Sequence, residues 1–210
     1  MGKNSQPIIV IGGSAGAITA LGKLLSVFPA QFPLPIVVAI HLHPLQDRYY
    51  LQHFSERSNL KIKEAEEKET ILPDCVYFAP PNYHLLIEDD LTLSLSIDSK
   101  VNFSRPSIDV LFESAVDACA PKLIGVILTG ANEDGAQGLR AIKQKGGIAI
   151  VQDPKTAESP YMPQAALNAT PVDYVLSIEE IGRRLIEIGQ RPDSYLSLNR
   201  STERKDTTLA

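Results

Sequence analysis

The sequence predicts an α/β fold: a doubly wound, mostly parallel sheet in a Rossmann-like three-layer arrangement, with an antiparallel edge or insertion. Over most of the 210 residues, short continuous apolar runs alternate with longer amphipathic segments. This alternation is typical of parallel strands joined by helices that cover both faces of the sheet. Between about residues 61 and 97 the pattern changes to short strands separated by turn residues, which indicates the antiparallel portion.

The first part of the chain contains two strand–helix units. Ile8 to Ile11 and Pro35 to Ile40 are apolar, β-branched runs, and each predicts a buried strand. Ala17 to Val27 carries leucines at helical spacing, and a second, more polar helix is expected from about Asp47 to Arg57. These segments predict the start of the parallel sheet.

The middle of the chain predicts an antiparallel insertion or sheet edge. Its short strands are expected at Lys61 to Ala65, Cys75 to Ala79, His84 to Glu88 and Leu91 to Ile97. The runs Pro80-Pro81-Asn82 and Glu88-Asp89-Asp90 lie between strands and favour turns.

The last part returns to the strand–helix pattern. Ser107 is a suitable N-cap for a helix to about Ala118, because its hydroxyl can accept a hydrogen bond from a free backbone amide. The further elements are expected at Leu123 to Leu128 (strand), Ala136 to Lys145 (helix), Gly147 to Val151 (strand), Asp173 to Leu176 (strand) and Ile178 to Ile188 (helix). We therefore expect one domain over residues 1–190 and a polar, flexible tail over 191–210.

Composition excludes several classes of function. The net charge is −5 and Lys and Arg do not cluster, so nucleic acid is not expected as a partner. The apolar runs are too short for a membrane helix, and the N-terminal residues lack the pattern of a signal peptide, so we expect no membrane insertion and a cytoplasmic location. Two cysteines and no HExxH motif predict neither a disulfide scaffold nor a metal site, and no cofactor is expected.

Ser14 lies in the most informative motif of the chain. The run Gly12-Gly13-Ser14-Ala15-Gly16 fits the G-x-S-x-G pattern between a predicted strand and a predicted helix. Small neighbours allow a sharp turn that exposes the serine hydroxyl, and the amides at the helix start can stabilise an oxyanion. The same turn is also compatible with a phosphate cradle or a plain tight turn.

His41 and Asp134 are the residue types that a serine nucleophile needs as base and orienting acid. Taken singly, His41 is a strand-end histidine and Asp134 a turn or N-cap aspartate. Together with Ser14 they each follow the carboxyl end of a predicted parallel strand, where ligands bind in open α/β sheets. Their order in the chain, Ser, His, Asp, differs from that of the α/β-hydrolases, but a triad is defined by its geometry.

Three other histidines compete with His41 for the role of base. His43 lies two residues further on, His84 begins a strand of the insertion and could line the cleft, and His53 falls in a polar helix.

The chain resembles the catalytic domain of the bacterial chemotaxis protein-glutamate methylesterases, the CheB family, from about Ile8 to Leu185. The segments that carry the resemblance are Ile11-Gly12-Gly13-Ser14-Ala15-Gly16, Lys63-Glu64-Ala65-Glu66, Leu72-Pro73, Tyr77-Phe78-Ala79-Pro80-Pro81, Arg105-Pro106-Ser107-Ile108-Asp109-Val110-Leu111-Phe112, Gly125-Val126-Ile127-Leu128-Thr129-Gly130, Asp134-Gly135-Ala136 and Met162-Pro163.

The resemblance implies a serine hydrolase that demethylates glutamyl methyl esters on chemoreceptor-like helical proteins, with deamidation of receptor glutamines as a second activity. It implies Ser14, His41 and Asp134 as the catalytic triad, and the oxyanion site follows at the backbone of Ala15 and Ala131. The chain departs from the family's usual residues at Ala15-Gly16-Ala17, around His41, and at Ala131, where the family often has Met.

Family members usually carry an N-terminal receiver domain, whereas the first strand here begins within about eight residues of Met1, so we expect a stand-alone domain. Either a separate receiver-domain protein regulates it, or it works constitutively outside chemotaxis. Two alternatives stay open: a catalytically inactive scaffold that binds receptors or a receiver protein, and a nucleotide-binding domain. Against the latter, the glycines at 12, 13 and 16 do not satisfy G-x-G-x-x-G.

Overall fold

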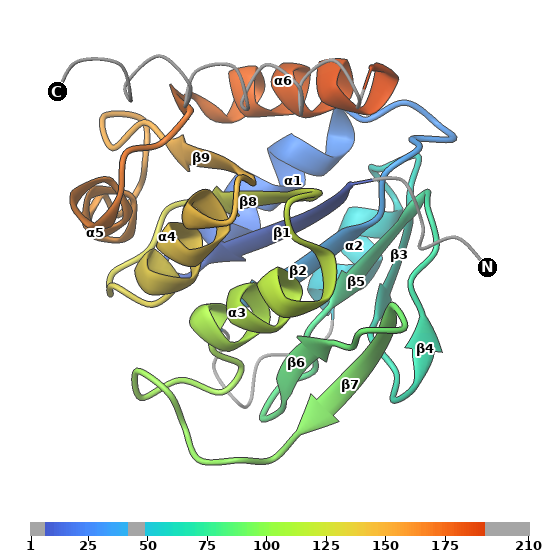
Figure 1. The fold of residues 1–210 in the computed structure, drawn as a ribbon. Coiled ribbons are helices and arrows are strands. Elements are labelled where there is room, and N and C mark those ends of the chain that lie inside the picture. Colours follow the sequence, from blue (N-terminus) through green and yellow to red (C-terminus); the bar gives the residue numbers. More distant parts are fainter. Residues whose placement is uncertain (1–6, 42–48, 192–210) are drawn as a thin grey trace, which may run out of the picture.

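The structure, a computed structural model, describes residues 7–41 and 49–191. They form three layers, with a seven-stranded sheet between two layers of helices and a small three-stranded sheet at one side (Figure 1). The fold class expected from the sequence is thus confirmed.

The large sheet is parallel in all its strand pairings. Its strands are, in spatial order, β10 (Tyr174–Leu176), β9 (Ile148–Gln152), β8 (Leu123–Ile127), β1 (Ile8–Gly13), β2 (Ile36–Ile40), β5 (Cys75–Phe78) and β3 (Lys61–Glu64).

The central strand β1 shows why both faces of this sheet are covered. Ile9 and Ile11 point into one hydrophobic core, while Ile8 and Val10 point into the other. Side chains alternate between the faces of a strand, so a run without polar residues needs apolar neighbours on both sides.

The helices supply those neighbours in two layers (Figure 1). The first layer consists of α1 (Ala17–Ser26), α2 (Tyr49–Ser55) and α6 (Ile178–Gln190). The second consists of α3 (Ile108–Cys119), α4 (Ala136–Gln144) and α5 (Tyr161–Ala169).

The small sheet is antiparallel and lies next to α3 (Figure 1). Its strands are, in spatial order, β4 (Glu69–Thr70), β7 (Thr92–Ser96) and β6 (His84–Ile87).

Two expectations about the elements are corrected. The strands expected at 61–65 and 75–79 are β3 and β5, and they pair in parallel within the large sheet instead of forming part of the antiparallel insertion. All of Cys75–Phe78 is buried, as a strand inside a covered sheet requires. Helix α5 was not expected at all. The beginning of the helix predicted at 47–57, His43 and the predicted tail from 192 lie outside the described residues.

The connections place a topological switch point beside β1. The chain passes from β1 to β2 on one side, and later enters β8 on the other side of β1. The register aligns Gly13 with Ile40 and Gly12 with Ile127, so the carboxyl ends of the three strands are level. Loops that follow them meet at one edge, where open α/β sheets bind ligands. Within the described ranges, no helix has the length and apolarity needed to cross a bilayer.

Candidate active site

Ser14 sits in a tight turn between β1 and α1, held from both neighbouring strands. Its amide donates to Thr129 O at 2.9 Å, and the His41 amide donates to Gly13 O at 3.1 Å. The turn then enters α1 through Gly16, which has a φ of 80° and would bring a Cβ to 2.8 Å from Glu158 Cβ. A residue with a side chain is strained there, so the glycine is required by both conformation and space. The Ser14 side chain remains partly exposed beyond the strand end.

His41 and Asp134 come together from loops that follow β2 and β8. His41 Nε2 lies 2.8 Å from Asp134 Oδ2, and the two side chains are 13% and 0% exposed. A carboxylate can only accept, so His41 carries its proton on Nε2 and presents Nδ1 as an acceptor. Asn132 Nδ2 donates to that nitrogen at 3.1 Å. The ring nitrogen that can act as a base is therefore Nδ1.

Asp134 is anchored at the amino end of α3. Its Oδ2 accepts from the amide of Ile108 at 2.7 Å, and its Oδ1 accepts from the Ser107 hydroxyl and the Asn102 side-chain amide, both at 2.8 Å. The amide of Asp109 adds a longer bond of 3.2 Å to Oδ1. A helix amino terminus offers unpaired N–H groups and a positive dipole end, so a buried carboxylate is stable there.

These bonds decide the charge of Asp134. Burial acts to raise the pKa of the carboxyl, but hydrogen bonds from His41, Asn102, the Ile108 amide and Ser107 outweigh it, and the net pKa is lowered. Asp134 is therefore ionised at neutral pH and can stabilise a positive charge on His41.

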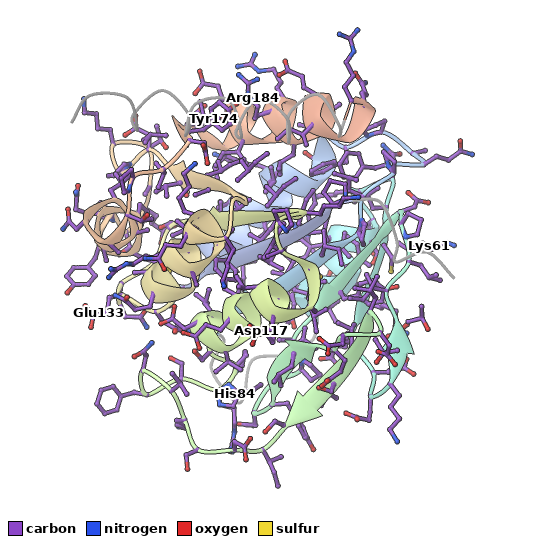
Figure 2. The ribbon with its side chains drawn as sticks, in the orientation of Figure 1. Lys61, His84, Asp117, Glu133, Tyr174 and Arg184 are labelled. Atoms are coloured by element: carbon purple, nitrogen blue, oxygen red, sulfur yellow. The ribbon has the colours of Figure 1, made fainter. Side chains whose placement is uncertain are left out.

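His84 has a structural position and does not compete for the role of base. It is 2% exposed, its Nδ1 accepts from the amide of Ser107 at 3.2 Å, and its Nε2 contacts Ser99 O at 3.1 Å (Figure 2). Both ring nitrogens are thus occupied, Nδ1 by Ser107, which caps α3, and Nε2 by Ser99. His53 lies half-buried in α2 next to Phe54.

Thr129 links the serine turn to the loop after β8. It is buried, and its hydroxyl donates to Ala15 O and accepts from the amide of Ser159, both at 2.8 Å. Its own amide donates to the buried Gln152 side chain at 2.8 Å. A threonine with three such bonds fixes the Ala15 peptide relative to β8.

The backbone near Ser14 leaves donors for an oxyanion. The Ser14 amide is already bonded to Thr129, so the next amide, of Ala15, is the first available one. Both Ala15 and Ala131 are exposed, and among the described residues their amides donate to no other group. These are the two positions expected from the sequence.

A pocket of about 390 Å³ opens next to Asp134, between the loops before α3 and α4 and the face of α5. It is lined by Asn102, Asp109, Glu133, Ala136, Gln137, Tyr161, Gln164, Ala165, Asn168 and Ala169. The Asn102 side-chain amide joins two carboxylates at its wall, since it also donates to Asp109 Oδ2 at 2.9 Å. Burial raises the pKa of Asp109 to about 6, the Gly138 amide opposes the rise, and the charge of Asp134 adds to it.

Sequence reasoning found His41 and Asp134 but missed Asn102 and Asn132, which bond to them. Asn132 had one available signal, because it lies two residues before Asp134 in a loop rich in turn residues. Asn102 had none, since its contact with Asp134 spans 32 residues of sequence.

The arrangement suits acyl transfer. It offers a serine in a glycine-rich turn at a helix start, a histidine at the next strand end oriented by a buried carboxylate, and free amides beside the serine. Such a site belongs to the serine hydrolases in chemical class.

The comparisons with known proteins identify the family. A model of the CheB methylesterase family matches residues 9–185, and the chain belongs to this family. The crystal structure of the *Thermotoga maritima* CheB methylesterase catalytic domain superposes with a TM-score of 0.85 at 34% identity, covering 88% of this chain and all of that one.

Two relatives show how this chain compares in length. A putative protein-glutamate methylesterase/protein-glutamine glutaminase of *Leptospira interrogans* is 57% identical over 87% of this chain and 94% of its own length. A protein-glutamate methylesterase/protein-glutamine glutaminase of *Maricaulis maris* is 35% identical over 85% of this chain, but the match covers only 45% of that protein.

Proposed function

We propose that this chain is a carboxylic ester hydrolase that demethylates glutamyl methyl esters on chemoreceptor-like helical proteins, with Ser14, His41 and Asp134 as its catalytic triad. The observation that carries the proposal is the bond of His41 to the buried Asp134 at the strand end next to the one that Ser14 follows. Membership of the CheB methylesterase family supports the choice of substrate.

The reaction proceeds in two steps. His41 Nδ1 takes the proton of Ser14 as the serine oxygen attacks the γ-carbonyl carbon, while Asp134 stabilises the imidazolium. The amides of Ala15 and Ala131 donate to the oxyanion; losing one such donor typically costs about 3 kcal/mol of transition-state stabilisation. Methanol leaves with the proton from His41, and water then cleaves the acyl-enzyme with the same base. Replacing methanol with ammonia as the leaving group gives deamidation of glutamine.

The surface around the site supports a protein substrate. Phe103 is 95% exposed and follows Asn102 in the loop that contacts Asp134, and Tyr161 at the pocket is 58% exposed. Exposed aromatic side chains next to a reaction site are typical anchors for a protein partner. We place the enzyme in the cytoplasm.

The alternative of nucleotide binding is disfavoured by charge. The carboxylate of Glu158 lies next to the first turn of α1, with Oε2 only 2.9 Å from where a Cβ on Gly16 would be. A phosphate at that helix start would face this negative group at close range.

The proposal is tested by hydrolysis of a helical peptide that carries a glutamyl γ-methyl ester. Ser14→Ala should abolish methanol release, whereas Ser26→Ala, which removes an exposed hydroxyl at the other end of α1, should not change it. Phenylmethanesulfonyl fluoride should modify the peptide that contains Ser14. Release that persists in Ser14→Ala, or an adduct on another serine, would contradict the triad.

A further inference from the structure

Asn132 occupies the one ring nitrogen on which the reaction depends. Its Nδ2 donates to His41 Nδ1 at 3.1 Å, and its Oδ1 accepts from the Asp134 amide at 3.2 Å. The side chain is therefore held in place at both ends, between base and acid. In the resting enzyme its amide hydrogen points at the lone pair that must receive the proton of Ser14.

We propose that the Asn132 side-chain amide is a third oxyanion donor, which leaves His41 Nδ1 for the substrate when the Ser14 hydroxyl takes its place on that nitrogen. This inference rests on the proposed function and adds a catalytic residue to it. It concerns a side chain, in contrast to the backbone donors of Ala15 and Ala131.

The chemistry of the first step explains the release. The O–H bond of Ser14 breaks, its proton passes to His41 Nδ1, and a bond forms between the serine oxygen and the γ-carbonyl carbon. The carbonyl π electrons move to the carbonyl oxygen, which becomes the oxyanion. Nδ1 has a single lone pair, so its bond from Asn132 breaks before the Ser14 hydroxyl can donate to this nitrogen. After the transfer Nδ1 is itself a donor, so the Asn132 N–H group cannot return to it.

Distance supports the transfer of this donor to the oxyanion. A serine oxygen that gives its proton to Nδ1 lies within about 3 Å of it, and the oxyanion forms on the carbon bonded to that oxygen. Asn132 Nδ2 is itself 3.1 Å from Nδ1, so it approaches the same lone pair as the serine oxygen. The bond from Oδ1 to the Asp134 amide keeps the group there without the histidine.

Two substitutions separate the donor from the structural contact. Asn132→Asp retains an oxygen that can accept from the Asp134 amide but removes the N–H donor, and Asn132→Ala removes both. We expect both variants to lower kcat by about 100- to 1,000-fold while KM changes little, because the donor acts on the transition state.

A second readout is affinity for a boronic acid that mimics the tetrahedral intermediate. It should weaken in both variants by a factor similar to the loss in kcat, while KM for the ester stays near the wild-type value. Gln52→Ala, which removes an exposed amide on α2, is the matched control and should leave both quantities unchanged.

The outcomes are distinct. If Asn132→Asp remains as active as wild type, Asn132 only positions the Asp134 backbone, and the inference is wrong. If kcat rises in Asn132→Ala, the Asn132 side chain only blocks His41 Nδ1 as a base, and this result also overturns the inference. A wild type that releases no methanol would overturn the proposed function and this inference with it, whereas an active wild type beside fully active variants overturns the inference alone.

Discussion

At the scale of single residues, the site depends on side chains that hold other side chains. Asn102 illustrates this, because its one amide group joins the carboxylates of Asp134 and Asp109. Replacing it leaves two buried acids next to each other without the donor that bridges them. The orientation of Asp134, and through it that of His41, then rests on fewer bonds.

We therefore predict that Asn102→Ala lowers both stability and activity. The loss of two part-buried bonds to carboxylates should cost about 1–3 kcal/mol of unfolding free energy, and misplacement of the acid should lower kcat by about 10- to 100-fold. Urea unfolding and steady-state kinetics measure the two effects. Unchanged values in both would show that the bridge is not needed.

The two acids should affect stability in opposite directions as the pH changes. The folded-state pKa of Asp109 is raised to about 6, so the folded state binds more protons than the unfolded state between about pH 6 and 4. The ionised form of Asp109 thus lowers the free energy of unfolding, and protonation restores this free energy as the pH falls through 6. The folded-state pKa of Asp134 is lowered, so its contribution is present above the unfolded value near 4 and is lost as the pH falls further.

The resulting prediction is that stability rises from pH 7 to about pH 5 by about 1.4 kcal/mol, roughly half of the full effect of the Asp109 shift, and falls below about pH 4. Asp109→Asn should remove the rise in stability between pH 7 and pH 5 and retain the fall below pH 4. The measurement is urea unfolding at a series of pH values. A wild-type stability that falls steadily from pH 7 to pH 5, with no difference in the variant, would contradict the assignment.

The residues of the proposed site that stand at strand ends could be predicted from the sequence, and those that reach it from elsewhere could not. Ser14, His41 and Asp134 each follow an apolar run, so position and chemical type together point to them. Asn102 contacts Asp134 and His84 contacts Ser107 across long stretches of sequence, and no local pattern predicts such contacts.

At the scale of elements, the loop before α4 depends on a glycine. Gly135 caps α4 with a φ of 93°, and a Cβ on it would lie 2.6 Å from Ile108 Cγ2 and from Ile127 Cδ1. Neither the conformation nor the space allows a side chain. Because Asp134 precedes this glycine, the turn also sets where the acid points.

We predict that Gly135→Ala destabilises the fold by about 2–4 kcal/mol, from left-handed strain and overpacking, and reduces activity. Gly22→Ala in α1 is the matched control, since its nearest neighbour would be Phe54 Cε1 at 3.6 Å. There the change should stabilise by about 0.5–1 kcal/mol through helix propensity. Thermal unfolding measures the stability of the two variants. Equal changes in stability would show that Gly135 has no special conformational or steric requirement.

Local pattern predicted most elements but not how all of them pair. The run Cys75–Phe78 is apolar and buried, yet its parallel pairing with β2 and β3 is a property of distant segments. Helix α5 escaped notice because Pro163 lies within it and its buried positions are few: Met162, Pro163 and Ala166. Ser107, by contrast, caps α3 as expected, since capping is a local interaction.

At the scale of the whole molecule, one sheet separates two hydrophobic cores. Each core draws on alternate residues of the same strands, so neither can persist when the sheet is lost. Tyr50 belongs to one core and Tyr77 to the other, which gives a natural probe on each side.

We predict a single cooperative unfolding transition for the described domain. Tyrosine fluorescence and far-UV circular dichroism should give the same midpoint in urea. Two separated midpoints would mean that the layers unfold independently.

The most direct test of the central claim is methanol release from methylated chemoreceptor fragments by the wild-type chain and by Ser14→Ala. We expect release by the wild type and none by the variant, with both proteins folded. Equal release by the two proteins would contradict the role of Ser14, and no release by a folded wild type would contradict the proposed activity on this substrate.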